Sequence, residues 1–364
     1  MSRVDFSYQL SREDGFQLQA EATLPEGSVT GIYGPSGSGK TTLLYCLAGL
    51  LRGSDTDQLS LGGETLQALS RFTPTHQRDI AMVFQDSRLF PHLDVAGNLA
   101  FAAKRRRREG PGLEEVTDWL GLGDLLQKPV TGLSRGQQQR VAIGRALLAA
   151  PRLLLLDEPL ANIDPAGRRD ILERLTMLKH TLGMTMVYVS HDMAELSQLA
   201  DWLMVLSHGQ ITAQGPLLEL SADIELSLAH EEQAAAILDV EVAAQDERYG
   251  LTELQLAGQP LYVAALDRPL KSLMRVRLPA RDVSLCRSRP TDSSILNVLE
   301  ARVDSIEAGE RAQVLVRLAV GEQYLLARVT RKSLDALALV EGEPIFAQVK
   351  SVALLSDARV NGSE

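Results

Sequence analysis

The stretch GPSGSGKT occupies residues 34–41 and decides the fold of the first part of the chain. It matches the pattern G-x-x-x-x-G-K-[ST], in which glycines let backbone N–H groups close around phosphates. The apolar run VTGIY at residues 29–33 precedes it, and a helical pattern begins at Lys40. The helix N-terminus adds the positive end of its dipole. The sequence therefore predicts a nucleotide site whose binding residues are Gly34, Pro35, Ser36, Gly37, Ser38, Gly39, Lys40, Thr41 and Thr42.

Two acids end a second apolar run, LLLLDE at residues 153–158. Ligands of α/β sheets bind at the carboxyl ends of the strands, so Asp157 and Glu158 are expected to face the nucleotide. We expect Lys40 to reach the β and γ phosphates, and Thr41 and Asp157 to support Mg²⁺. Glu158 is then placed to polarise an attacking water.

Apolar strands alternate with longer helical segments up to about residue 215, which is typical of an α/β domain with a mostly parallel sheet. We predict a first domain over residues 1–233 that contains a helical subdomain at about 87–150. The expected strands are 16–24, 29–33, 80–84, 153–157, 184–189 and 202–206, and the expected helices are 40–50, 135–148, 166–182 and 193–199.

Composition narrows the class of protein. The chain has 364 residues, a formal net charge of −10 and only two cysteines. This net charge argues against a general electrostatic hold on nucleic acid, which needs clustered Lys and Arg, so no nucleic-acid partner is expected. Two distant cysteines give no disulfide framework and suit a reducing compartment. The first residues lack a signal peptide, and no apolar stretch is long enough to span a membrane.

After residue 233 the sequence pattern changes from alternating strands and helices to short β-rich runs. This change predicts a second domain over residues 234–364. Residues 238–265 echo residues 299–328, and each stretch is followed by a further strand at 275–285 or 345–354. A duplicated unit of this kind predicts a small all-β, OB-like barrel. The alternative is the similarity that any two amphipathic hairpins share.

Six motifs follow one another in the first domain: GPSGSGKT (34–41), VFQD (83–86), LSRGQQQR (133–140), LLLLDEP (153–159), ANID (161–164) and VSHD (189–192). This ordered set resembles the ATPases of ABC transporters. One residue departs from the commoner LSGGQ signature, because Arg135 stands at its third position. The resemblance implies an ABC-type phosphate-loop ATPase that binds ATP and Mg²⁺.

The resemblance also implies roles for particular residues. Glu158, His191 and Gln85 would be catalytic, and Mg²⁺ would be held by Thr41, Gln85 and Asp157. The signature residues would instead meet the γ phosphate bound by the opposite subunit of a head-to-tail homodimer; they are Ser134, Gly136 and Gln137. The family usually stacks an aromatic ring on adenine, and Phe16 is the candidate here, although it is also a core candidate.

A single nucleotide domain followed by a β-rich tail is similar to bacterial importers, and the strongest resemblance is to molybdate importer ATPases with a Mop/TOBE-like tail. It rests on FQDSRLFPHLDVAGNLAF (84–101), SSILNVLEARV (293–303) and AQVKSVAL (347–354). In the tail, Ser294, Lys350 and Ser351 match oxyanion donors, but Leu296 replaces the expected arginine. Tail binding of molybdate and a purely structural tail therefore both remain open.

The resemblance implies a peripheral protein on the cytoplasmic face of the bacterial inner membrane. Its partners would be integral-membrane permease subunits and, indirectly, a periplasmic molybdate-binding protein. Two alternatives stand beside molybdate import. One is import of another solute such as sulfate, and the other is a soluble ABC ATPase without a transport role.

Overall fold

A computed structural model describes residues 3–13, 15–69, 71–308, 312–350 and 352–354. The chain divides into two compact units, residues 1–214 and 215–364. The boundary predicted from the sequence, at 233/234, lies further along the chain. Residues 215–233 contain two short helices that belong to the second unit, and Ile237 N of that unit donates to Ser221 Oγ at 3.2 Å. No helix among the described residues is long and apolar enough to cross a membrane.

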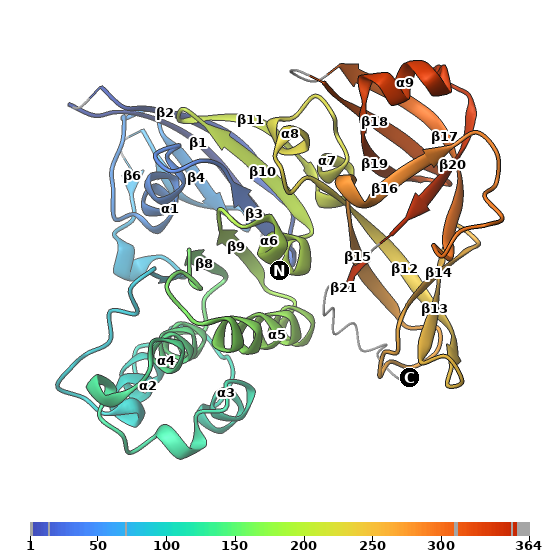
Figure 1. Cartoon of the computed structure of the whole chain (residues 1–364). Helices are drawn as coiled ribbons and strands as arrows, with labels where there is room; N and C mark the ends of the chain where they lie inside the picture. Colours follow the sequence, from blue (N-terminus) through green and yellow to red (C-terminus); the bar gives the residue numbers. More distant parts are fainter. Residues whose placement is uncertain (1–2, 14, 70, 309–311, 351, 355–364) are drawn as a thin grey trace. The chain divides into compact units, whose positions relative to one another are not determined.

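An 11-stranded sheet organises the first unit, in the order β6-β5-β4-β1-β2-β11-β10-β3-β9-β8-β7 (Figure 1). One half is antiparallel, where β1 pairs with β2 and β4. The other half is parallel from β10 to β7. The strands are β1 (Val4–Ser11), β2 (Gln17–Leu24), β3 (Val29–Tyr33), β4 (Gln58–Leu61), β5 (Glu64–Ala68), β6 (Arg71–Phe72), β7 (Ile80–Val83), β8 (Leu153–Asp157), β9 (Thr185–Val189), β10 (Trp202–Ser207) and β11 (Gln210–Pro216).

The helices of the first unit are α1 (Lys40–Ala48), α2 (Val95–Ala103), α3 (Leu113–Trp119), α4 (Arg135–Leu148), α5 (Pro165–Leu182) and α6 (Met193–Leu199). Helix α1 contributes Leu43, Leu44 and Leu47 to a core that also contains residues of both halves of the sheet. Helices α2, α3 and α4 lie within residues 87–150. They approach closely at Gly144 of α4, where a Cβ would lie 3.1 Å from side-chain atoms of Leu99 and Leu120.

Two five-stranded sheets share one hydrophobic core in the second unit. Their orders are β14-β13-β12-β15-β21 and β16-β20-β17-β18-β19 (Figure 1). The strands are β12 (Ala235–Asp246), β13 (Leu251–Leu256), β14 (Gln259–Ala264), β15 (Leu273–Pro279), β16 (Val283–Cys286), β17 (Asn297–Ala308), β18 (Gln313–Val320), β19 (Gln323–Thr330), β20 (Pro344–Val349) and β21 (Ala353–Leu354), and the helices are α7 (Leu217–Ser221), α8 (Ser227–His230) and α9 (Arg331–Leu337).

The sequence repeat is a structural repeat. Both β12–β13–β14 and β17–β18–β19 are antiparallel meanders, and each carries a register shift at the equivalent place, after Val242 and after Val303. The repeats also bind each other reciprocally. Gln259 Nε2 donates to Glu300 O at 2.9 Å, and Gln323 Nε2 donates to Asp239 O at 2.9 Å. Chance similarity of two hairpins does not account for these matched features.

The prediction of single strands at 275–285 and 345–354 is wrong. The first stretch divides into β15 and β16, separated by a 3₁₀ turn at Ala280–Asp282, and the second divides into β20 and β21. The later strand of each pair crosses to the other sheet, so that β16 pairs with β20 and β21 pairs with β15. Each repeat is thus completed by a strand of the other.

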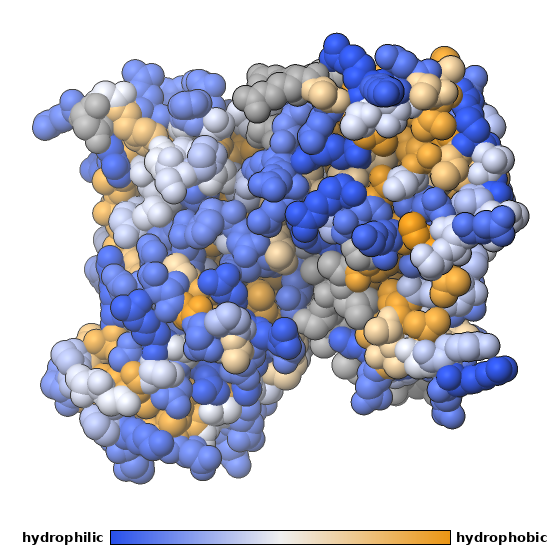
Figure 2. Space-filling view, in the orientation of Figure 1, coloured by the Kyte–Doolittle hydropathy of each residue, from blue (hydrophilic) through white to orange (hydrophobic). Residues whose placement is uncertain are grey.

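The buried residues are mostly apolar and the exposed ones mostly polar. Apolar residues fill the cores of both units, and the visible face of the molecule is mostly hydrophilic with apolar residues interspersed (Figure 2). The predicted α/β class of the first domain and the all-β class of the second are confirmed.

Candidate functional site

The phosphate-loop sequence forms a tight turn between β3 and α1. All five residues of β3 are buried. The backbone at Gly39, which caps α1, has φ of 105°, a conformation that side chains rarely adopt. At Gly34 a Cβ would lie 2.1 Å from the carbonyl oxygen of Leu206 on β10. The loop therefore requires glycine at both positions, and its backbone is left open to a ligand.

Two polar side chains are buried inside this loop. The ammonium of Lys40 donates to Gly34 O at 2.7 Å and to Pro35 O at 3.0 Å. Burial lowers the pKa of Lys40, and the nearby Glu158 and Asp157 oppose that shift. Ser38 is only 2 % exposed, and its hydroxyl has no hydrogen-bond partner among the described residues. A buried hydroxyl without a partner is costly, so the loop retains an unused donor for an anion.

Thr41 and Asp157 meet beside the loop. The hydroxyl of Thr41 donates to Asp157 Oδ1 at 3.0 Å. Burial raises the pKa of Asp157, while the bond from Thr41 opposes the shift. No group of three or more His, Cys, Asp or Glu side chains suited to a metal occurs in the described part of the chain. A hydroxyl and one carboxylate fit Mg²⁺, which is usually bound by few protein ligands together with substrate phosphates.

Glu158 and His191 also lie together, although 33 positions separate them in the sequence. His191 Nδ1 is 3.3 Å from Glu158 Oε2. The backbone of Glu158 has φ of 42°, which is uncommon for a residue with a large side chain. Its N–H donates to Val189 O at 3.1 Å, so β9 holds this turn. Strained backbone of this kind persists where the surrounding structure over-determines it, and it often marks functional sites.

Gln85 stands apart from the other predicted metal ligands. It is exposed just after β7, and it lines a cavity of about 300 Å³ with residues of α4 and of the segment 159–163. Among the described residues no hydrogen bond joins Gln85 to Thr41 or Asp157. The neighbouring backbone is held by Gln139, whose Nε2 donates to Phe84 O at 3.2 Å.

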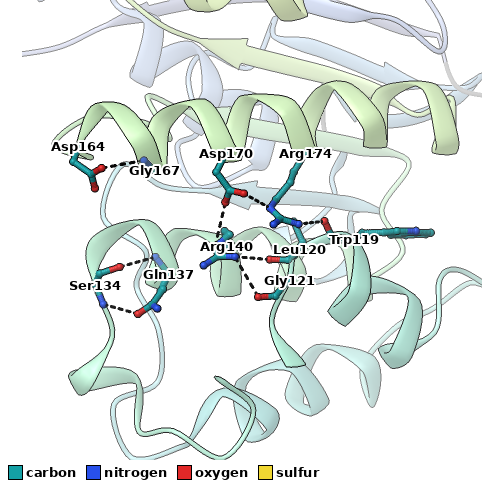
Figure 3. A network of polar contacts seen from close by, with 10 residues as sticks. All are labelled: Trp119, Leu120, Gly121, Ser134, Gln137, Arg140, Asp164, Gly167, Asp170 and Arg174. Atoms are coloured by element: carbon teal, nitrogen blue, oxygen red, sulfur yellow. Dashed lines mark hydrogen bonds and ion pairs between the residues drawn. The ribbon is translucent and has the colours of Figure 1, made fainter. Parts of the chain in front are cut away.

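The signature residues open helix α4. Ser134 caps the helix: its N–H donates to Gln137 Oε1 at 3.0 Å, and Gln137 N donates to Ser134 Oγ at 3.3 Å (Figure 3). A Cβ on Gly136 would lie 3.6 Å from Ile163 Cγ2, so this helix end packs beside the segment that precedes α5. The signature residues make no hydrogen bond with residues 34–42 in the described chain.

An ion-pair network braces the helices that carry these loops (Figure 3). Asp170 of α5 is 2.9 Å from Arg174 Nε and 3.7 Å from Arg140 Nε of α4. Both arginines also donate to backbone oxygens at the end of α3, which are those of Trp119, Leu120 and Gly121. The network fixes α4 against α5, and therefore the signature residues against the cap of α5 at Asp164.

Sequence reasoning missed Arg12, because no motif includes it. Its guanidinium donates to Thr42 Oγ1 at 3.1 Å and lies 5.7 Å from the centre of the Phe16 ring. Phe16 itself lies against the loop, since a Cβ on Gly39 would come within 2.8 Å of its ring. Phe16 also packs on the core of the first unit.

The predicted oxyanion residues of the tail lie near one strand end. Asn297 pairs with Val349, so Lys350 follows directly after the pair and Ser294 precedes it by three positions. Both side chains are exposed, and Leu296 is 63 % exposed. Ser351 lies outside the described residues.

Fold and site together define a nucleoside triphosphatase of the phosphate-loop class: a glycine loop with a buried lysine after β3, and two acids at the end of β8, a parallel strand that β9 separates from β3 in the sheet. Residues 18–161 match the family model of the ABC transporter, and residues 293–355 match that of the TOBE domain.

Three relatives align over nearly the whole chain. The Molybdenum import ATP-binding protein ModC of Aromatoleum aromaticum is 47 % identical, covering 94 % of this chain and 91 % of its own length. ModC of Rhodobacter capsulatus is 43 % identical over 96 % of this chain and 98 % of its own. ModC 1 of Azotobacter vinelandii is 44 % identical over 97 % of both. The chain belongs to the family of ABC-transporter ATP-binding proteins that these ModC proteins represent.

Two solved structures resemble the chain over a smaller part. CbiO1 of Clostridium perfringens, part of the ABC transporter complex cbiONQ, is 29 % identical with a TM-score of 0.53, and the match covers 61 % of this chain and 91 % of that one. A nucleotide-free ATP-binding cassette is 25 % identical with a TM-score of 0.52, over 59 % and 92 %. The family expected from the motifs is confirmed. The roles of individual site residues stay predictions.

Proposed function

We propose that the chain is the ATP-hydrolysing subunit of an importer that moves molybdate through a membrane permease. The observation that carries the proposal is the convergence of Lys40, Thr41, Asp157, Glu158 and His191 around the phosphate loop. The full-length similarity to proteins named for molybdenum import supports the choice of solute. That similarity favours molybdate over sulfate and over a soluble ABC ATPase.

In this proposal ATP enters the loop at residues 34–42, and its phosphates replace the loop carbonyls as partners of Lys40. The free hydroxyl of Ser38 supplies a further donor. Thr41 and Asp157 would hold Mg²⁺, which supplies charge neutralisation of the phosphates when bound. Gln85 joins this set only after moving from its exposed position, because no bond links it to Thr41 or Asp157 in the described chain.

Hydrolysis rests on Glu158 and His191. Glu158 accepts a hydrogen bond from the attacking water and polarises it toward the γ phosphate. His191, 3.3 Å from Glu158, donates to the γ phosphate. The charge that develops on the phosphoryl oxygens is stabilised by Lys40 and by the N–H groups of the loop.

The signature residues Ser134, Gly136 and Gln137 serve the ATP of a second copy of the chain. Two observations support this role. The signature residues make no hydrogen bond with residues 34–42 in the described chain, and they stand at the N-terminus of α4, where the end of the helix favours an anion. Two chains in head-to-tail orientation would then enclose two ATP molecules. The pair would sit on permease subunits at the cytoplasmic face of the inner membrane. A periplasmic molybdate-binding protein would deliver molybdate to these permease subunits.

Uptake of radioactive molybdate tests the solute. Cells that lack their own molybdate ATPase receive this chain together with the permease and binding protein of a molybdate importer, and we expect uptake that excess sulfate does not abolish. The matched control is the Lys40→Ala chain, which should give no uptake. Uptake of sulfate instead of molybdate, or full ATPase activity with no effect of a permease, would contradict the proposal.

For the tail we propose weak molybdate binding through Ser294, Lys350 and Ser351. A bound dianion needs several charge-assisted donors to replace its hydration, and Leu296 stands where the expected arginine would supply one of them. We expect Leu296→Arg to tighten molybdate binding to the full-length chain by about ten- to a hundredfold, and Lys350→Ala to abolish it. Isothermal titration with molybdate measures both, with sulfate as competitor. Absence of molybdate heat in both the native and the Leu296→Arg chains would make the tail purely structural.

A further inference from the structure

A buried carboxylate lies behind the His191 loop. Glu195 of α6 is 6 % exposed, and one of its oxygens, Oε2, accepts hydrogen bonds from Tyr188 at 2.9 Å and from Ser190 at 2.8 Å. Burial raises the pKa of Glu195, and the two hydroxyl bonds oppose that shift. A buried carboxylate is costly unless such donors satisfy it. Ser190, one of its two donors, is the residue that precedes the predicted catalytic histidine.

Glu195 acts on both residues that flank His191. Ser190, whose hydroxyl donates to Glu195, also accepts a hydrogen bond from Asp192 N at 3.0 Å. Asp192 in turn accepts from Ala194 N at 2.8 Å and begins helix α6. The hydroxyl of Ser190 therefore links the carboxylate of Glu195 to the backbone N–H of Asp192 on the other side of His191.

The ring of His191 has little else to hold it. Its side chain is 66 % exposed, and its one polar contact with the described residues is the one with Glu158 at 3.3 Å. Because few side chains pack against an exposed ring, the position of the ring depends mainly on the conformation of its own backbone. A shift of residues 190–192 would therefore move Nδ1 away from Glu158 and the γ phosphate.

Arg168 extends the arrangement to α5. Its Nη1 lies 3.7 Å from Asp192 Oδ2 and 3.7 Å from Glu195 Oε1. Arg168 stands one turn after Asp164, the cap of α5, where the segment 161–164 ends. The negative charges under the His191 loop thus face a cation carried by the helix that follows this segment.

We infer that Glu195 is a positioning residue for hydrolysis, which holds the backbone of residues 190–192 so that His191 meets Glu158 and the γ phosphate. This inference rests on the proposed catalytic role of His191. Glu195 touches no reacting atom. Its removal should therefore slow turnover and leave the binding of ATP to the phosphate loop unchanged.

Steady-state ATPase kinetics of the full chain test the inference with Glu195→Gln, which keeps the size of the side chain but removes its negative charge. It also replaces one of the two carboxylate oxygens by an NH₂ group, which can accept neither from the hydroxyls of Tyr188 and Ser190 nor from Arg168. We expect kcat to fall about ten- to a hundredfold, because a small displacement of a catalytic group has effects of this size, and KM to stay within about twofold. Tyr188→Phe removes one of the two donors and should give a smaller fall of the same kind. The control is Ser197→Ala on the same helix, whose hydroxyl bonds to Met193 O within α6; its kcat should stay within about twofold of the native value.

The decisive comparison repeats Glu195→Gln in a His191→Ala chain. If Glu195 acts through His191, the second substitution should change kcat by less than about twofold in that background. An equal loss in both backgrounds, or an unchanged kcat in the native background, would overturn the inference. If Glu195→Gln does not fold, as thermal unfolding would show, the same cycle with Tyr188→Phe decides. A fully active His191→Ala chain would instead refute the proposed role of His191.

Discussion

Glu158→Gln is expected to lower ATP hydrolysis by about 10²- to 10⁴-fold while ATP binding persists. The amide cannot accept the water proton, yet it has nearly the same volume as the carboxylate. Lys40, Thr41 and Asp157 keep their contacts, so the phosphates are still held. The strained backbone at Glu158, with φ of 42°, fixes this residue where its side chain meets His191.

Nucleotide binding and phosphate release are measured on the same preparation, so that loss of hydrolysis can be told apart from loss of ATP binding. Because bound ATP is no longer consumed, Glu158→Gln should also accumulate a dimer, visible as a doubled mass in light scattering. Glu173→Gln is the matched control, since Glu173 is an exposed acid of α5. Turnover at the native rate by Glu158→Gln would remove the catalytic role of Glu158.

Ser134→Arg is expected to abolish hydrolysis without weakening the binding of ATP to the chain's own loop. Ser134 caps α4, and in the proposed dimer it meets the ATP of the other chain. A long cationic side chain there would obstruct the facing nucleotide and break the cap with Gln137. The serine cap contributes about 1 kcal/mol, which the packed helix can lose and still fold.

Mixing the two variants Ser134→Arg and Lys40→Ala shows whether each ATP site is built from two chains or from one. A dimer of one Ser134→Arg chain and one Lys40→Ala chain has one site with both defects and one site with neither. Activity should therefore return on mixing two inactive preparations. Ser284→Arg is the control, because Ser284 is an exposed serine of β16 in the second unit. Hydrolysis by Ser134→Arg alone at the native rate would refute the composite site.

The sequence by itself determined the features that depend on neighbouring residues. Strands β3 and β8 and helices α4 and α6 have the predicted bounds. Their signals are local: short apolar runs, and the capping pair Ser134 and Gln137 at the start of α4. The order of the six motifs was sufficient for the family, because each motif is a short string that chance rarely produces in series.

Only the tertiary structure decided which distant segments meet. The exchange of β16 and β21 between the two repeats could not be predicted, because the alternation of apolar residues in a strand does not name its partner. The placement of Glu195 behind His191, and of Arg168 beside it, likewise depends on how α5 and α6 pack. Hydrogen bonds and ion pairs act over a few ångströms in space, and sequence separation contains no record of that proximity.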